Sequence, residues 1–138
     1  MKIRNILYYG WPVLVVGIAL IFYFQDNANP SGAGQRLYTT HCANCHMDNG
    51  QGLRRLIPPL AGADYVHAAG AEMACLIRNG IADTMVVNGV TYSGVMPGNT
   101  YLDEVELVAV LNYIKQSWGN SGETVTYPEV KKALSQCP

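Results

Sequence analysis

The chain has 138 residues, enough for one domain with short appendages. Hydrophobic residues make up 49% of it, and the formal net charge at pH 7 is −1. Lys and Arg number only nine and form no basic run or face, so we expect no nucleic-acid-binding function.

The N-terminal stretch is far more apolar than the rest of the chain. Ile6–Phe24 contains no charged residue, and as a helix it would span roughly 28 Å, close to the hydrocarbon thickness of a bilayer. Lys2 and Arg4 precede it and Asp26 follows it, so the positive-inside rule predicts a cytoplasmic N-terminus. We therefore expect residues 1–25 to be a transmembrane anchor in a bacterial inner (cytoplasmic) membrane. The rest of the chain would then lie on the periplasmic or outer side.

A cleaved signal peptide is the alternative interpretation of this stretch. Signal peptides have apolar cores of about 7–15 residues and end in small residues at the cut. Here the apolar run is longer, and it ends in Tyr-Phe-Gln-Asp without an Ala-x-Ala pattern, which favours a retained anchor. Residues 26–33 are polar and contain Gly and Pro, which predicts a short linker that keeps the next domain near the membrane surface.

The pattern beyond the linker predicts a mostly helical domain over residues 34–119, followed by a polar tail over 120–138. Helices are expected over 34–45, 71–79 and 103–118, with a loop broken by Gly and Pro over 47–62. The last helix is the best marked. Asp103 is its expected N-cap, Glu106 lies three residues on, and Gly119 ends it.

A short β-hairpin is expected over residues 86–92, between the second and third of these helices. Asn88-Gly89 lies between β-branched residues, which is the pattern typical of a type I′ turn.

The chemistry of the chain is concentrated at residues 42–46, which read Cys-Ala-Asn-Cys-His. C-x-x-C-H is the attachment sequence of c-type haem. Two thiols at this spacing can reach the two vinyl groups on one porphyrin edge, and the next residue directs its imidazole at the iron. A zinc site would need a second close cysteine pair, and the other two cysteines are 62 residues apart; a thioredoxin-type pair would need a βαβ context. The motif predicts one covalent haem c on Cys42 and Cys45, with His46 as an iron ligand.

The second axial ligand must come from elsewhere in the chain, and the candidates are Met47, Met73, Met85, Met96, His41 and His67. The methionine directly after the haem histidine cannot cross to the opposite haem face, and the one in the predicted middle helix is expected in the core. His41 precedes the motif on the same helix and should point away. Met96 lies in an irregular loop, and Pro97 restricts it to an extended geometry that helps carry the thioether across the ring. We expect Met96 to be the ligand, with Met85 and His67 as alternatives.

The pattern resembles class I cytochromes c over residues 34–118. In that family a Gly and an aromatic residue precede the haem motif and pack against an aromatic residue of the last helix. Gly34, Tyr38 and Tyr113 fall at matching places. The resemblance implies an all-α fold of three to five short helices around one haem. In this chain one N-terminal transmembrane helix and the small β-hairpin insertion would be added to that fold.

The same resemblance implies roles for two residues of the 47–62 loop. The family has a Pro after the haem histidine whose carbonyl accepts the imidazole N–H, and Pro58, twelve residues past His46, resembles it. Such a bond fixes the ring orientation and raises the basicity of the ligand. Leu60 would then contact the haem.

Two features depart from a minimal member of this family. The first is the hairpin, which either covers the lower edge of the haem, the interpretation we favour, or contacts a partner subunit. The second is a further pair of cysteines. An even number in an exported domain indicates a disulfide, so we predict a Cys75–Cys137 bridge that ties the tail to the middle helix.

A haem iron with His and Met ligands has no open position for a substrate, and the Met ligand raises its reduction potential. The expected activity is outer-sphere transfer of single electrons, without catalysis. The expected partners are redox proteins, foremost other subunits of a membrane respiratory complex such as a quinol-oxidising complex (alternative complex III among them) or a terminal reductase. An independent tethered shuttle is the first alternative, and a ligand-binding haem sensor or enzyme is the second.

Overall fold

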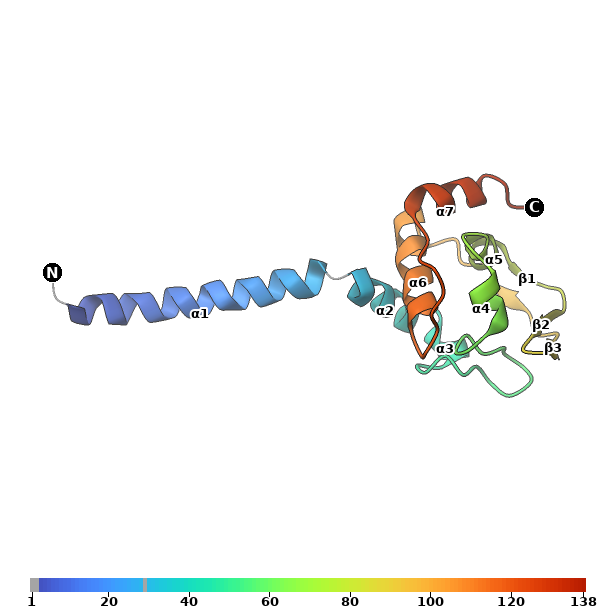
Figure 1. The fold of residues 1–138 in the computed structure, drawn as a ribbon, viewed down its shortest axis with the longest axis horizontal. Helices are drawn as coiled ribbons and strands as arrows, with labels where there is room; N and C mark the ends of the chain where they lie inside the picture. The colour runs from blue at the N-terminus through green and yellow to red at the C-terminus, as the bar shows by residue number, and fades with distance from the viewer. Residues whose placement is uncertain (1–2, 29) are drawn as a thin grey trace.

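A computed structural model of the chain describes residues 3–28 and 30–138, with the side chains of 11–23 and 32–138. The helices are α1 (Ile3–Ala28), α2 (Pro30–His41), α3 (Ala43–His46), α4 (Asp64–Ala68), α5 (Met73–Asn79), α6 (Glu104–Gln116) and α7 (Tyr127–Leu134). The strands are β1 (Gly80–Ile81), β2 (Met85–Val87), β3 (Val90–Tyr92) and β4 (Met96–Pro97). Figure 1 shows α1 extending away from a domain formed by all the other elements.

α1 is a single helix of 26 residues, and its described side chains, 11–23, are mostly apolar and exposed. Within the described part of the chain, no helix is both long enough and apolar enough to cross a membrane. The two ends of the predicted span, residues 6–10 and 24, lie outside the described side chains. The predicted linker, 26–33, is helical wherever the structure describes it, because α1 runs to residue 28 and α2 begins at residue 30.

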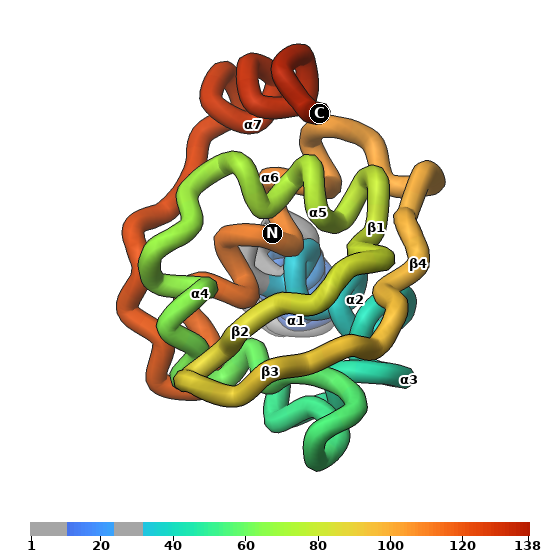
Figure 2. The backbone as a smooth tube through the Cα atoms, turned by 90° about the vertical axis from the view of Figure 1, so that its right-hand side faces the viewer, coloured from blue at the N-terminus to red at the C-terminus, as the bar shows by residue number. Residues whose placement is uncertain are grey.

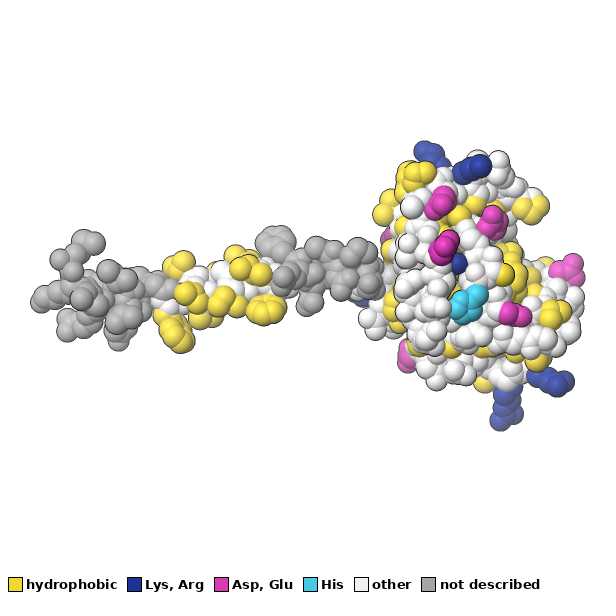
Figure 3. Space-filling view, viewed as in Figure 1, with side chains coloured by type: hydrophobic (Ala, Val, Ile, Leu, Met, Phe, Trp, Pro, Cys, Tyr) yellow, Lys and Arg dark blue, Asp and Glu magenta, His cyan; other side chains and the backbone are white. Residues whose placement is uncertain are grey.

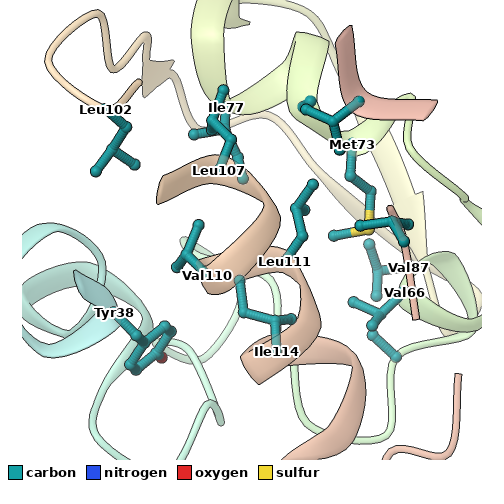
Figure 4. Packing of buried hydrophobic residues seen from close by; sticks show 14 of the residues in the cluster. Tyr38, Val66, Met73, Ile77, Val87, Leu102, Leu107, Val110, Leu111 and Ile114 are labelled. Carbon is teal, nitrogen blue, oxygen red and sulfur yellow. The ribbon is translucent and has the colours of Figure 1, made fainter. Parts of the chain in front are cut away.

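The core of the domain is built around α6. Leu107, Val110, Leu111 and Ile114 are at most 3% exposed, and they recur at the spacing that keeps one helix face turned inward. Figure 4 shows these side chains meeting Tyr38 of α2 on one side and residues of α4, α5 and the hairpin on the other. α6 begins as predicted, because the Asp103 side chain accepts bonds from the amides of Val105 and Glu106, and the Glu106 carboxylate accepts one from the Asp103 amide.

α2 crosses α6 at Gly34, and the predicted aromatic packing is present. A Cβ at Gly34 would lie 2.7 Å from the Cβ of Tyr113 and would also meet the Ala109 carbonyl. The Tyr38 ring lies 5.5 Å from the Tyr113 ring and 4.9 Å from the Trp118 ring. The absence of a side chain at this glycine therefore sets the distance between the two helices.

The hairpin and the middle helix form where they were expected. β2 and β3 pair antiparallel, with Val87 opposite Val90. Asn88 and Gly89 have φ of 51° and 73°, the two positive values that a type I′ turn requires. α5 ends at Gly80, whose φ of 79° suits glycine.

The tail contains a helix that the sequence analysis did not anticipate. α7 begins with a capping box in which Thr126 and Glu129 bond each other's main-chain amides, and Val130 is fully buried. The predicted disulfide is present: Cys75 and Cys137 are joined with a Cα–Cα distance of 5.6 Å, which ties the end of the tail to α5. The short helix α4 and the β1–β4 pair were also not predicted.

Candidate haem site

The attachment motif lies where α2 passes into the single turn of α3. The Cys42 amide donates to the Tyr38 carbonyl at 2.8 Å, and the His46 amide donates to the Cys42 carbonyl at 2.9 Å, so the turn is held by main-chain bonds. Cys42 is partly buried and Cys45 is exposed, and neither is in a disulfide. Burial, followed by the neighbouring Cys45, raises the pKa of the Cys42 thiol to about 11. Both cysteines and His46 line a cavity of about 340 Å³.

His46 is oriented for metal binding by the loop that follows it. The side chain is 8% exposed, and its Nδ1 lies 3.1 Å from the Pro58 carbonyl oxygen, as the family resemblance implied. A carbonyl can only accept a hydrogen bond, so Nδ1 carries the proton and the lone pair of Nε2 is available to a metal. Burial lowers the pKa of His46, while the bond to Pro58 opposes this shift. Burial therefore favours the neutral imidazole, and the bond to Pro58 fixes the orientation of the ring.

Glycine 52 allows the loop to bring Pro58 to His46. Gly52 has a φ of +64°, and a Cβ there would lie 2.8 Å from the Pro58 carbonyl carbon. Its amide donates to the His46 carbonyl at 3.1 Å, and Leu60 is fixed by a bond from its amide to the Gly50 carbonyl at 2.7 Å. Leu60 lines a second cavity of about 70 Å³ that also contains Cys42, His46 and Met96. The loop therefore delivers both of the residues that were predicted on it.

Met96 reaches the cavity from a separate part of the fold. It lies in β4 and pairs with Ile81 of β1, so the end of α5 holds the strand in place. The Asn99 amide donates to the Ile77 carbonyl at 2.7 Å, which fixes the chain just after this strand. Met96 lines both cavities, but so does Met85 from the hairpin. Two thioethers therefore line both cavities, and the preference for Met96 stays a prediction.

Of the other candidates for the second ligand, two line neither cavity and two line one cavity each. Met73 is buried in the core, as expected, and it also lines the smaller cavity. Met47 and His67 are exposed and line neither cavity. His41, expected to point away, is exposed but belongs to the lining of the larger cavity.

The site suits a flat, largely apolar macrocycle attached by two thioethers. Besides the motif, the walls are mainly aliphatic and aromatic, including Ile57, Ile77, Ile81 and Tyr92. The larger cavity has a volume within the range usual for small-molecule sites. The two thiols outside the disulfide and an oriented imidazole all face this space, so the residues present fit haem c.

Three side chains support the haem site through hydrogen bonds that the sequence analysis did not predict. The Tyr38 hydroxyl donates to the Met47 carbonyl at 2.6 Å, and Trp118 Nε1 donates to the Asp48 carbonyl at 3.1 Å. Asn120 Nδ2 donates to the Leu60 carbonyl at 2.9 Å. All three tie the 47–62 loop to the rest of the domain. Their side chains bond main-chain carbonyls, and such contacts leave no motif in a sequence.

Comparison with known proteins agrees with this geometry. The cytochrome c family model matches residues 31–118. Similar proteins include cytochrome c-552 of Thermus thermophilus, 35% identical over 108 residues that cover 72% of this chain and 82% of that protein. They also include the cytochrome c subunit of a quinone alcohol dehydrogenase of Gluconobacter oxydans, 29% identical over 78% of this chain but only 23% of the longer subunit. The chain belongs to the cytochrome c family, whose members carry covalently bound haem c and transfer electrons.

Proposed function

We propose that this cytochrome carries single electrons as a membrane-anchored subunit of a respiratory quinol-oxidising or terminal reductase complex. The observation that carries the electron-transfer part is the convergence of His46 and Met96 on one apolar cavity from separate elements. With both axial positions filled by the protein, the iron would have no open site for a substrate.

The chain's own residues would supply a rigid and dry environment for the electron. Haem, when bound, supplies a one-electron iron couple. The carbonyl of Pro58 keeps the His46 ring in one orientation, and aliphatic walls such as Ile77 and Ile81 keep water from the iron. The α2–α6 crossing and the β1–β4 pair hold the two sides of the cavity together. A site that does not rearrange favours fast outer-sphere transfer.

The mouth of the cavity provides a contact surface for redox partners. Leu56, Val95 and Tyr101 line the larger cavity and are 65%, 72% and 89% exposed. Exposed apolar side chains in one place mark contact surfaces. We place electron entry and exit at this mouth.

Membrane anchoring is supported by the sequence of α1 and by its exposed side chains. At 1.5 Å per residue, the 26 residues of α1 would measure roughly 39 Å, enough to cross a bilayer core. The charges around residues 6–24 would place the haem domain on the periplasmic or outer side of a bacterial inner membrane. α2 begins two residues after α1 ends, and such a short junction limits the reach of a swinging domain. It therefore favours a resident subunit over a tethered shuttle.

A haem-stained native gel of membranes solubilised in mild detergent tests membership in a complex. A band inside a large assembly is the expected result, and the neighbouring subunits would identify donor and acceptor. A haem band that runs alone would favour the shuttle. Haem staining of the soluble fraction would show cleavage of the N-terminal stretch and contradict anchoring.

A further inference from the structure

A large groove of the described domain lies apart from the mouth of the haem cavity. It is a groove of about 740 Å³ between α7, the α4–α5 connection and residues 123–125. None of its lining residues lines the cavity of about 340 Å³. Residues 119–138, which supply one wall, lie beyond the region that matches the cytochrome c family model. The groove therefore lies partly outside the matched region, on residues that do not line the larger haem cavity.

The wall built by the tail is firmly fixed. Asn112 bonds both main-chain groups of Val125, at 2.9 and 2.7 Å, and the Gly122 amide donates to the Lys115 carbonyl at 3.1 Å. The disulfide holds the far end of α7 against α5. The opposite wall is fixed from below by Lys115, which is 2% exposed and donates to two carbonyls at the end of α4, at 3.1 and 2.7 Å. The groove therefore needs little ordering before a partner binds.

The groove is lined by more exposed negative than positive charge. Glu72, Glu123 and Glu129 are exposed carboxylates, against one exposed lysine, Lys132. Glu72 and Glu129 each accept a bond from a nearby main-chain amide, while Glu123 has no partner among the described residues. An ionised carboxylate has about four acceptor sites, so all three keep capacity for a further donor. Asp and Glu side chains are visible around α7 and α4 on this face (Figure 3).

We propose that this groove binds a basic segment, carrying lysine or arginine, of another subunit of the complex, and that it holds the cytochrome in place while the cavity mouth exchanges electrons. The inference rests on the proposed function, because it requires a complex. The negative charge of the groove favours a positively charged partner segment. Anionic lipid headgroups and acidic peptides would be repelled by the three carboxylates.

The test is a charge reversal on the groove, read on the same haem-stained native gel. Glu72→Lys with Glu123→Lys should leave the haem spectrum unchanged, since neither residue lines a haem cavity. It should lower the haem fraction in the large complex at least tenfold. The control, Asp48→Lys with Asp83→Lys, makes the same change in net charge at exposed positions outside the groove. It should leave that fraction within twofold of wild type.

The possible outcomes separate the two proposals. If wild type and the groove variant both remain in the complex, the groove proposal is wrong and the proposed function stands. If wild type itself runs alone, both fail. A wild-type band at twice the chain mass that the groove variant loses would make the occupant a second copy and overturn a partner subunit.

A second measurement avoids substitutions. Labelling of carboxylates by carbodiimide and glycine ethyl ester, followed by mass spectrometry, should be at least fivefold slower at Glu72 and Glu123 in the wild-type complex than in the detergent-released cytochrome. Asp83 should label equally in both. Equal labelling of the two groove carboxylates in both forms would overturn the proposal.

Discussion

Replacing Gly34 by alanine sets two physical effects against each other. Within a helix, alanine is favoured over glycine by about 1 kcal/mol, so helix propensity alone predicts a more stable protein. At the crossing of α2 and α6, however, the new methyl would lie 2.7 Å from Tyr113 Cβ and would also meet the main chain of Ala109. A main-chain carbonyl cannot rotate away as the end of a side chain can, so the helices must move apart.

We expect the cost of moving the two helices apart to exceed the gain in helix propensity. Overpacking typically costs about 1–3 kcal/mol, and displacement of main chain belongs at the upper end of that range. After the propensity gain, the expected net loss in the free energy of unfolding is about 1–2 kcal/mol. For a domain of this size that corresponds to a fall in Tm of roughly 4–16 °C. The loss should extend to the haem site, because α2 leads directly into Cys42.

The assay is guanidinium unfolding of the haem-loaded protein, followed by both far-UV circular dichroism and the Soret band. Thr39→Ala, at an exposed position of the same helix, measures propensity alone and should raise stability by a few tenths of a kcal/mol. If Gly34→Ala is as stable as wild type or more stable, the close crossing of α2 and α6 is not what constrains this glycine.

Three further predictions follow from the tail and its contacts. Cys75→Ala with Cys137→Ala should lower the free energy of unfolding by about 4 kcal/mol, because the bridged cysteines are 62 residues apart. The haem spectrum should stay unchanged. A loss below about 1 kcal/mol would contradict this role of the disulfide. The bond from the Thr126 hydroxyl is the main cause of a lowered pKa at Glu129. A carboxyl group whose pKa is lowered by folding stabilises the fold at pH values above its unfolded pKa, and this stabilisation is lost as the pH falls through its folded pKa. Glu129→Gln should therefore reduce Tm at pH 7 and reduce it less at pH 3. Equal effects at both pH values would exclude the charge as the cause. Lys115→Met leaves two carbonyls at the end of α4 without their donor. It should lower the free energy of unfolding, measured with a chemical denaturant, by about 2–4 kcal/mol and speed amide exchange in α4. An unchanged exchange rate in α4 would contradict this role.

Features with strong local chemistry were predicted from the sequence. The haem motif, the hairpin turn at Asn88 and the capping box at Asp103 each depend on residues within a few positions of one another. The longer-range pairs Tyr38–Tyr113 and His46–Pro58 came from the family resemblance, because spacing alone does not bring distant segments together.

The errors have a different physical origin. α7 was missed because a helix of only eight residues is too short to show a clear apolar repeat. It is held by tertiary contacts, namely Val130 packed inside and the disulfide just beyond its end. The Thr126–Glu129 capping box was the available signal. The linker was placed at residues 26–33 because they are polar and contain Gly and Pro, and the structure is helical there wherever it is described. Pro30 occupies the first position of α2, where its missing N–H costs nothing.

The sequence favours Met96 over Met85 because Pro97 restricts Met96 to an extended geometry, whereas the structure brings both thioethers to the site.

The most direct test of the central claim is the methionine-to-iron charge-transfer band of the oxidised, haem-loaded protein. The wild type and Met85→Ala should show the band, and their reduced forms should not bind carbon monoxide. Met96→Ala should lose the band and bind carbon monoxide, because its iron then has an open position. Survival of the band in Met96→Ala, or its loss in Met85→Ala, would contradict the ligand assignment. Carbon monoxide binding by the reduced wild type would contradict a carrier whose iron has no open site.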